Sequence, residues 1–217
     1  MSSSAEFLDA LVRGDRYDAS RVVDALLDHG THLTELYLEI VQPAMLEIGC
    51  RWERNELSVA DEHRASAIAQ AVMGRAFERV YRWHDKRTLT LVASCAEGER
   101  HRLGLRMICD LLEISGWDTS YLGESVPVES LVDFAVKRRP NVVAISVTTA
   151  PNVGRVRDVI SAIRAAMPVP PVIIVGGRAI GGDIALARLL GADLTAADAR
   201  EAVRVLVARF AQTDRTG

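Results

Sequence analysis

The sequence has no long apolar run, which argues against a membrane-spanning protein. None of its apolar stretches approaches the roughly 20 residues that a helix needs to cross a membrane. The N-terminus, Met-Ser-Ser-Ser-Ala-Glu-Phe, has neither a basic region nor an apolar core and so lacks the features of a secretion signal. We therefore expect a cytoplasmic protein that makes no contact with a membrane.

Cysteine is also scarce, and the cysteines present do not form a framework. Cys50, Cys95 and Cys109 are odd in number and lack the paired spacing of metal-binding motifs. This pattern argues against a zinc or disulfide framework and fits a reducing compartment. Cys109 lies on the apolar face of a predicted helix, where a cysteine is expected to be part of the core.

Strong net charge and phosphate-binding loops are missing as well. The formal net charge is −3 for 217 residues, so no overall field attracts nucleic acid. Neither Gly-x-Gly-x-x-Gly nor Gly-x-x-x-x-Gly-Lys occurs, which counts against a nucleotide cofactor. No nucleophile is evident beside a base. We therefore expect no direct nucleic acid binding and no catalytic residues in the chain itself.

The first part of the chain, residues 5–83, has helical periodicity and no strand signal. Two apolar stripes end at Gly14 and Gly30, where glycine commonly closes a helix. Pro43 falls within a third periodic segment and is expected to kink it, and Ser58 is a good N-cap for a fourth. We predict a four-helix bundle domain over residues 1–86, with the third helix at 32–55 and the fourth running from 58 to Tyr81 or Trp83.

After Lys86, short apolar runs alternate with helical segments, which predicts a parallel sheet. Five strands in this alternation favour a doubly wound, flavodoxin-like Rossmann domain of order 2-1-3-4-5 over residues 87–217, with its crevice between the first and third strands. The expected strands are 88–94, 117–122, 141–147, 171–176 and 192–194. The expected helices are 102–115, 127–138, 152–166, 183–190 and 197–211.

A histidine follows the first predicted strand, at the edge of the sheet where ligands bind in such folds. Glu99 stands two residues before His101. Its carboxylate can hold one imidazole nitrogen and leave the other free for a metal. A solvated Glu-His pair in a loop is the alternative, because three fixed positions make a weak motif.

Small residues follow the third and fourth predicted strands: Ser146, Thr148, Gly176 and Gly177. A phosphoacceptor receiver needs acidic residues after the first and third strands, and these are missing, so a receiver of the usual kind is excluded. Glycine permits close approach to the backbone, which allows a bulky group to lie there. Glycine pairs also follow strands in many unrelated α/β folds.

A second group of residues flanks the turn at 55–57 between the last two bundle helices. Trp52 precedes this turn, and Glu62 and His63 follow it, so the turn brings all three to one end of the bundle. The alternative is that Trp52 caps the core, Glu62 stabilises the helix N-terminus and His63 is solvated.

Together these features resemble the cobalamin (B12)-binding domain of the methionine synthase and corrinoid protein type, joined to its helical-bundle cap. The likeness covers nearly the whole chain, and each motif falls at the expected strand end. The family's Asp-x-His-x-x-Gly corresponds to Glu99-x-His101-x-x-Gly104, its Ser-x-Leu or Ser-x-Thr to Ser146-x-Thr148, and its Gly-Gly to Gly176-Gly177.

The resemblance implies a role for each part of the predicted crevice. His101 would be the lower axial ligand of cobalt, in place of the cofactor's own nucleotide base. The displaced base and its tail would enter the crevice lined by Ser146, Thr148 and the two glycines. Glu99 replaces the usual aspartate, and its extra methylene changes the geometry with which the carboxylate reaches His101.

The bundle resembles the cap of light-sensing, adenosylcobalamin-dependent transcriptional regulators, in which the Trp and the Glu-His pair face the upper ligand. The matching segment is Ile48-Gly49-x-x-Trp52 followed by Ser58-Val59-Ala60-x-Glu62-His63. The sequence departs from that pattern at Glu53, where the best-known members have a histidine that binds cobalt after photolysis, and in having no DNA-binding domain. His63 or another group would then have to be the upper ligand after photolysis, and any genetic output would run through a partner such as a transcription regulator or through self-association.

The resemblance therefore implies a cobalamin-binding sensory module, with adenosylcobalamin favoured and methylcobalamin as the alternative cofactor. Two other functions stay open. In one, the chain is a corrinoid subunit that carries a methyl group between two methyltransferases. In the other, it binds or delivers cobalamin without any switch.

Overall fold

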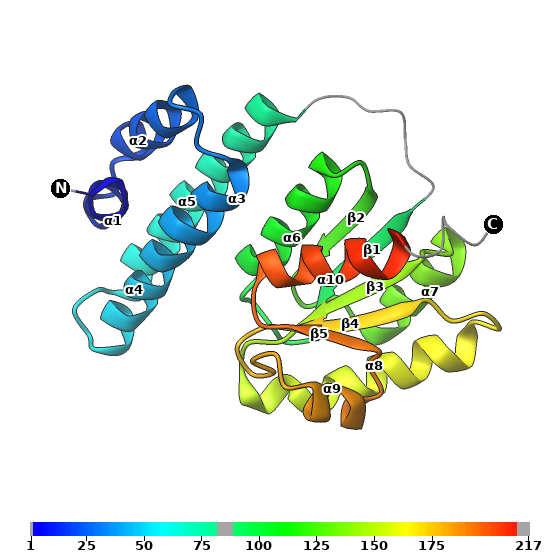
Figure 1. The fold of residues 1–217 in the computed structure, drawn as a ribbon. Coiled ribbons are helices and arrows are strands. Elements are labelled where there is room, and N and C mark those ends of the chain that lie inside the picture. Colours follow the sequence, from blue (N-terminus) through cyan, green and yellow to red (C-terminus); the bar gives the residue numbers. More distant parts are fainter. Residues whose placement is uncertain (1, 82–88, 212–217) are drawn as a thin grey trace. The chain divides into compact units, whose positions relative to one another are not determined.

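A computed structural model describes residues 2–81 and 89–211 of the chain (Figure 1). The chain divides into two compact units, Met1–Arg82 and Trp83–Gly217. The expected domain boundary between residues 86 and 87, and the alternative helix end at Trp83, lie outside the described residues. Within the described ranges, none of the helices has the length and apolar character needed to cross a membrane.

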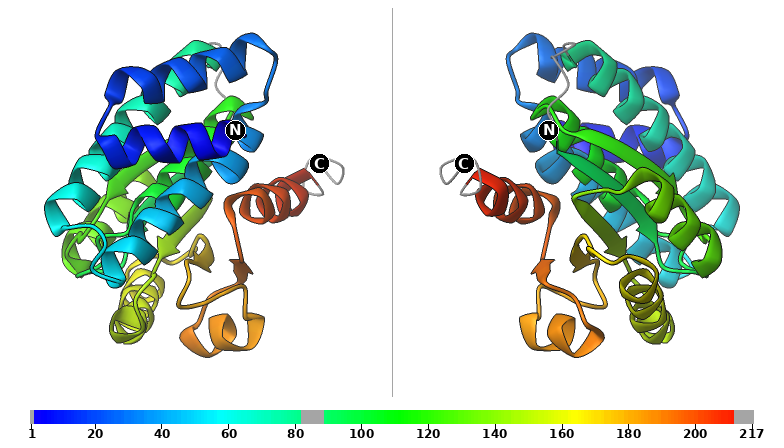
Figure 2. Two further views of the ribbon diagram at one scale, coloured as in Figure 1. Left: turned by 90° about the vertical axis from the view of Figure 1, so that its left-hand side faces the viewer. Right: turned by 90° about the vertical axis from the view of Figure 1, so that its right-hand side faces the viewer.

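The first unit is helical, as the periodicity predicts, and two of its helices end or begin where expected. Gly14 adopts φ 72° at the C-terminus of the first helix. Ser58 caps the last helix by accepting from the amide of Asp61, whose carboxylate in turn accepts from the Ser58 amide. The first two helices lie side by side (Figure 2). The α-helices are α1 (Ser3–Arg13), α2 (Arg16–Asp28), α3 (Leu33–Glu35), α4 (Gln42–Glu53) and α5 (Val59–Val80).

The third predicted helix differs from the expectation of one α-helix kinked at proline. A π-helix, Leu36–Val41, joins α3 to α4 immediately before Pro43. The amide of Gln42 donates to the carbonyl of Tyr37, five residues back. Proline has no amide hydrogen, and its ring crowds the carbonyl four residues earlier, so the wider turn accommodates it. The irregularity therefore lies one turn before the proline.

The second unit is a five-stranded, all-parallel sheet in the predicted order, β2-β1-β3-β4-β5. One strand is displaced from its prediction: β5 begins at Leu194, because Asp193 still belongs to the preceding turn, where its carboxylate accepts from the amide of Ile173 at 2.7 Å. The strands are β1 (Thr90–Cys95), β2 (Asp118–Gly123), β3 (Val142–Ser146), β4 (Val172–Gly176) and β5 (Leu194–Ala196). The helices are α6 (Leu103–Ile114), α7 (Val128–Arg138), α8 (Val153–Ala166), α9 (Ile184–Leu190) and α10 (Ala199–Ala211).

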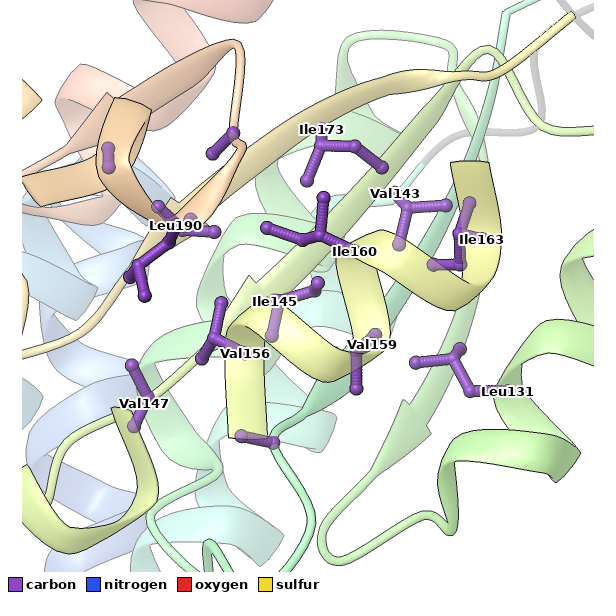
Figure 3. Packing of buried hydrophobic residues seen from close by; sticks show 14 of the residues in the cluster. Leu131, Val143, Ile145, Val147, Val156, Val159, Ile160, Ile163, Ile173 and Leu190 are labelled. Atoms are coloured by element: carbon purple, nitrogen blue, oxygen red, sulfur yellow. The ribbon is translucent and has the colours of Figure 1, made fainter. Parts of the chain in front are cut away.

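Helices cover both faces of this sheet, which explains why its strands are apolar on both sides. Helices α7, α8 and α9 pack on one face, where Val156 and Ile160 of α8 lie against Ile145 of β3 (Figure 3). Helices α6 and α10 pack on the other face, against residues such as Leu91 and Ile174. The strands are thus fixed by two cores, and their carboxyl ends form a common edge.

The three cysteines differ in accessibility, and this predicts a labelling pattern. Cys50 is exposed, whereas Cys95 of β1 and Cys109 of α6 are buried in the core between the sheet and α6. Burial raises the pKa of Cys95 to about 12 and also raises the pKa of Cys109. We expect iodoacetamide near neutral pH to modify Cys50 alone in the folded protein and all three thiols in denaturant, as read by mass spectrometry. Modification of Cys109 as fast as that of Cys50 would contradict this packing.

Candidate functional site

The loop that follows β1 carries His101 to the carboxyl edge of the sheet. The amide of Ala96 donates to the carbonyl of Ser146 on the neighbouring β3 at 2.9 Å, and a tight turn brings the amide of Glu99 to the carbonyl of Ala96 at 2.9 Å. Gly98 in this turn has φ 82°. The loop buries the Glu99 side chain to 1% exposure and leaves the His101 side chain 57% exposed.

One oxygen of Glu99 fixes the orientation of the imidazole. Its Oε1 accepts from His101 Nδ1 at 2.5 Å, from the His101 amide at 3.0 Å and from the Arg100 amide at 2.9 Å. Because an ionised carboxylate only accepts hydrogen bonds, Nδ1 carries the ring proton. The Nε2 lone pair is then available to a metal.

The other oxygen of Glu99 reaches the loop after β3. Its Oε2 accepts from the amides of Thr148 and Thr149 at 2.8 and 3.0 Å and from the Thr149 hydroxyl at 3.1 Å. Burial raises the pKa of Glu99, but the hydrogen bonds from His101 and the two threonines outweigh it and lower that pKa to about 2. Glu99 is therefore ionised at neutral pH.

Thr149 belongs to the site although no sequence motif singles it out. Thr148 contributes its backbone amide, which was not expected. Thr148 is expected to line the crevice, and the structure shows its backbone amide bound to Glu99. Their position in the sequence could have indicated this role, because two consecutive threonines follow the third strand, and the predicted strand order places that strand beside the first.

Small residues form a row across four strands at this edge of the sheet. Cys95 pairs with Ser146, Ser146 with Gly176, and Gly176 with Ala196. Paired residues of parallel strands project to the same face, so these four positions present only small side chains to one face of the sheet. Gly177 follows the row with φ 97°, and a Cβ there would lie 2.2 Å from the carbonyl oxygen of Val147.

Gly104, the last residue of the His101 motif, is the second residue of α6 and is exposed. Apart from its chain neighbours and its own helix backbone, a Cβ built on it would meet no atom of the described residues within 4 Å. The packing of the chain therefore does not by itself require glycine at this position. The structure brings Glu99, His101 and Thr148 together through hydrogen bonds, and it places Ser146, Gly176 and Gly177 at the same sheet edge.

The second group of predicted residues flanks the α4–α5 turn within the first unit. Trp52 is the penultimate residue of α4 and is 44% exposed. Glu62 lies in the first turn of α5, where its Oε1 accepts from the Ser66 hydroxyl at 2.7 Å and its Oε2 lies 3.5 Å from His63 Nε2. The side chain of His63 is 70% exposed, and Glu53 ends α4 in an exposed position.

Ion pairs surround the turn that follows Trp52 and the end of α4. Arg51 contacts Glu47 at 2.8 Å, and Arg54 contacts Glu47 at 3.4 Å and Glu56 at 2.6 Å. Asn55 adopts φ 57°, a left-handed conformation that asparagine tolerates in turns. The backbone of the turn is held by hydrogen bonds from the amides of Asn55 and Glu56 to the carbonyls of Trp52 and Arg51. Trp52 itself is partly exposed.

The His101 loop offers a transition metal one protein ligand, an imidazole nitrogen. An imidazole nitrogen is a good ligand for borderline metal ions, and the buried carboxylate behind it sets the tautomer that such a metal needs. The edge beside it carries small residues and two glycines, so a large planar group could approach the backbone. The residues present therefore fit a metal held by a bulky organic ring.

Comparison with known proteins gives matches along most of the chain. Two family models, both described as B12 binding domain, match residues 4–76 and residues 89–207. The HTH-type transcriptional repressor CarH of Myxococcus xanthus is 30% identical over 165 residues, which are 75% of this chain and 54% of that protein. The chain thus spans about half the length of this relative.

Corrinoid proteins match over a larger share of their length. Monomethylamine corrinoid protein 1 of Methanosarcina mazei is 25% identical over 203 residues, which are 91% of this chain and 92% of that protein. Among solved structures, the monomethylamine corrinoid protein of Methanosarcina barkeri has a TM-score of 0.79 at 19% identity and covers 93% of this chain and 95% of its own. This likeness confirms the predicted fold.

The conformation of Gly177 predicts a loss of stability on substitution. In Gly177→Ala, the new methyl group would collide with the Val147 carbonyl, and the backbone would have to keep a positive φ that alanine disfavours. We therefore expect the free energy of unfolding to fall by about 2 kcal/mol or more. Gly154→Ala in α8 is the control, because its Cβ meets nothing within 4 Å, and should change stability by less than about 1 kcal/mol. Urea unfolding measures both; equal effects would show that the Gly177 contact is not as described.

Proposed function

The chain belongs to the family of proteins with a B12 binding domain, and from this premise we propose that it is a sensory or regulatory module that holds cobalamin with His101 as the lower axial ligand of cobalt. The orientation of His101 carries the proposal. Its Nδ1 donates to the ionised Glu99, and its exposed Nε2 is left as the donor atom. When bound, cobalamin supplies a cobalt ion that has an exchangeable ligand on its upper face.

In this proposal the sheet edge receives the part of the cofactor that His101 displaces. Ser146, Thr148, Gly176 and Gly177 line the place for the nucleotide base and its tail. The support is the row of small residues in register across β1, β3, β4 and β5, together with the close approach of Gly177 to Val147. Larger side chains in this row would obstruct that place.

We further propose that the bundle covers the upper face of the corrin and acts as the switch. Trp52, Glu62 and His63 would face the upper ligand, with adenosylcobalamin preferred and with His63 as the replacement ligand after its loss. The support is their joint placement around one turn, the partial exposure of Trp52 and the similarity to the repressor CarH. Light or loss of the upper ligand would then change contacts with a protein partner or between copies of the chain.

A second candidate function is that of a methyl carrier for a cobalamin-dependent methyltransferase system. The observation that favours it is the extent of the match to monomethylamine corrinoid proteins, which covers 91% of this chain and 92% of theirs. In that case the partner would be a methyltransferase, and methylcobalamin would be the relevant form. The role of His101 is the same in both candidates, so the two differ in the upper ligand and the partner.

The two candidates predict different responses to light. Purified protein is mixed in the dark with adenosylcobalamin or methylcobalamin, and visible spectra and sizing profiles are recorded before and after green light. For the sensor we expect preference for the adenosyl form and a light-driven change in both spectrum and assembly. Tight binding of methylcobalamin with no change in assembly would favour the carrier, and no binding of either would refute the assignment of the site.

The role of His101 has its own test in a matched pair of variants. In His101→Ala no imidazole is present to replace the nucleotide base, so the visible spectrum should lose the signature of imidazole-bound cobalt. His29→Ala removes an exposed histidine at the end of α2 and should leave that spectrum unchanged. An unaltered cobalt spectrum in His101→Ala would rule out this residue as the axial ligand.

A further inference from the structure

The loop after β1 is also held from the side of β2, the edge strand next to β1 (Figure 1). Near the start of the loop, the amide of Gly98 donates to the Ser125 hydroxyl at 3.2 Å. At its end, the Arg102 guanidinium donates to Glu124 Oε1 at 3.1 Å, and the Arg102 carbonyl accepts from the Tyr121 hydroxyl at 3.4 Å. These contacts therefore bind the loop on both sides of its histidine.

A bulge in β2 directs the end of this strand. Tyr121 pairs with Ala93 of β1, and the following residue of β1, Ser94, pairs with Gly123, so Leu122 is an additional residue in the edge strand. A bulge bends its strand and redirects the residues beyond it, and bulges are common at sheet edges and beside functional sites. The residues that hold the loop after β1 all lie at this bulge or just beyond it.

Ser125 has a backbone conformation that serine disfavours. Its φ is 52°, in the left-handed region that glycine adopts freely and that other residues adopt only with strain. Glycine at this position would relieve the strain but would lose the hydroxyl that accepts from Gly98. Strain of this kind persists where the surrounding contacts fix the backbone. The contact between the two loops is therefore kept together with a conformation that opposes it.

Tyr121 is held in place by α6. The guanidinium of Arg106 lies over the Tyr121 ring, 5.5 Å from its centroid, and Arg106 Nε donates to Asp110 Oδ1 at 2.6 Å. Burial raises the pKa of Tyr121 to about 12, so the hydroxyl keeps the proton that it donates. Its acceptor, the carbonyl of Arg102, directly precedes α6. The contacts from β2 thus reach the point where the loop becomes a helix.

We propose that the end of β2 acts as a clasp, formed by Tyr121, Glu124 and Ser125, which sets the position of the axial histidine. The proposal rests on the function proposed for His101 and deepens it. Glu99 fixes the orientation of the imidazole ring, whereas the clasp fixes the two ends of the loop and limits how far the ring moves toward or away from a metal. A loop that is ordered before the cofactor binds lowers the cost of ordering on binding. Ser125 is thus a positioning residue.

Variants of Ser125 separate positioning from stability. Ser125→Ala removes the hydroxyl and keeps the strain, whereas Ser125→Gly removes both, so urea unfolding should show Ser125→Ala to be the less stable. In the cofactor-free protein, both should speed hydrogen exchange at the Gly98 amide by about three- to tenfold, because its acceptor is lost. Ser125→Asn should restore the protection, since asparagine tolerates this conformation and supplies a carbonyl acceptor.

The second readout uses cob(II)alamin and protein labelled with ¹⁵N. In the electron paramagnetic resonance spectrum, a ¹⁵N imidazole splits the cobalt lines into doublets and the cofactor's own ¹⁴N base splits them into triplets, so the imidazole-bound fraction is measured. This fraction should fall to a similar extent in Ser125→Ala and Ser125→Gly, although their stabilities differ, and should recover in Ser125→Asn. Tyr121→Phe removes only a hydroxyl and should lower the fraction less, because its contact is longer.

Two controls match these changes outside the clasp. Arg139→Gly relieves a comparable strain, at φ 50°, between α7 and β3 and so at the opposite edge of the sheet. Tyr17→Phe removes an exposed hydroxyl from α2. Both controls should keep the wild-type exchange rate at Gly98 and the wild-type imidazole-bound fraction.

The outcomes separate the clasp from a purely structural role. An imidazole-bound fraction that stays at the wild-type value in both Ser125→Ala and Ser125→Gly would overturn the clasp, as would a fraction that falls only in the less stable variant. If the wild-type protein gives no ¹⁵N doublet with cob(II)alamin, the proposed function fails, and Gly98 exchange in the cofactor-free protein still decides whether the clasp holds the loop.

Discussion

The geometry of the candidate site depends on one buried carboxylate. Glu99 is 1% exposed and ionised, and a buried charge is tolerated only where hydrogen-bond donors surround it. Two loops supply those donors, so each loop must adopt the path that brings its amides to the carboxylate. The imidazole of His101 is oriented by this shell, because its Nδ1 is one of the donors.

The parallel sheet makes this convergence possible. In the order β2-β1-β3-β4-β5, the first and third strands are neighbours and their carboxyl ends lie together. Helices α7, α8 and α9 on one face and α6 and α10 on the other bury the strands on both sides, so their ends are held firmly. The same register that brings Thr148 to Glu99 aligns Cys95, Ser146 and Gly176 and leaves an edge without bulky side chains.

In the helical unit, the predicted residues Trp52, Glu62 and His63 lie around one turn between α4 and α5. Its helices were predictable from apolar periodicity and from caps such as Ser58, because these signals are local. The π-helix before Pro43 was not, since it depends on how the chain accommodates a missing amide hydrogen and a bulky ring. The partial exposure of Trp52 likewise follows from packing and not from its position in the sequence.

The sequence by itself determined the alternation of helices and strands and placed Glu99 within reach of His101, because periodicity, caps and a contact between residues two apart are local. The strand order was predicted from that alternation, since few topologies accommodate successive βαβ units. Only the tertiary structure decided that Thr148 and Thr149 complete the shell of Glu99, and that Ser146 and Gly176 stand in one row. Such contacts are set by strand register. A shift of one residue would turn each side chain to the opposite face, and the pattern of a buried parallel strand, apolar on both faces, does not specify which register is adopted.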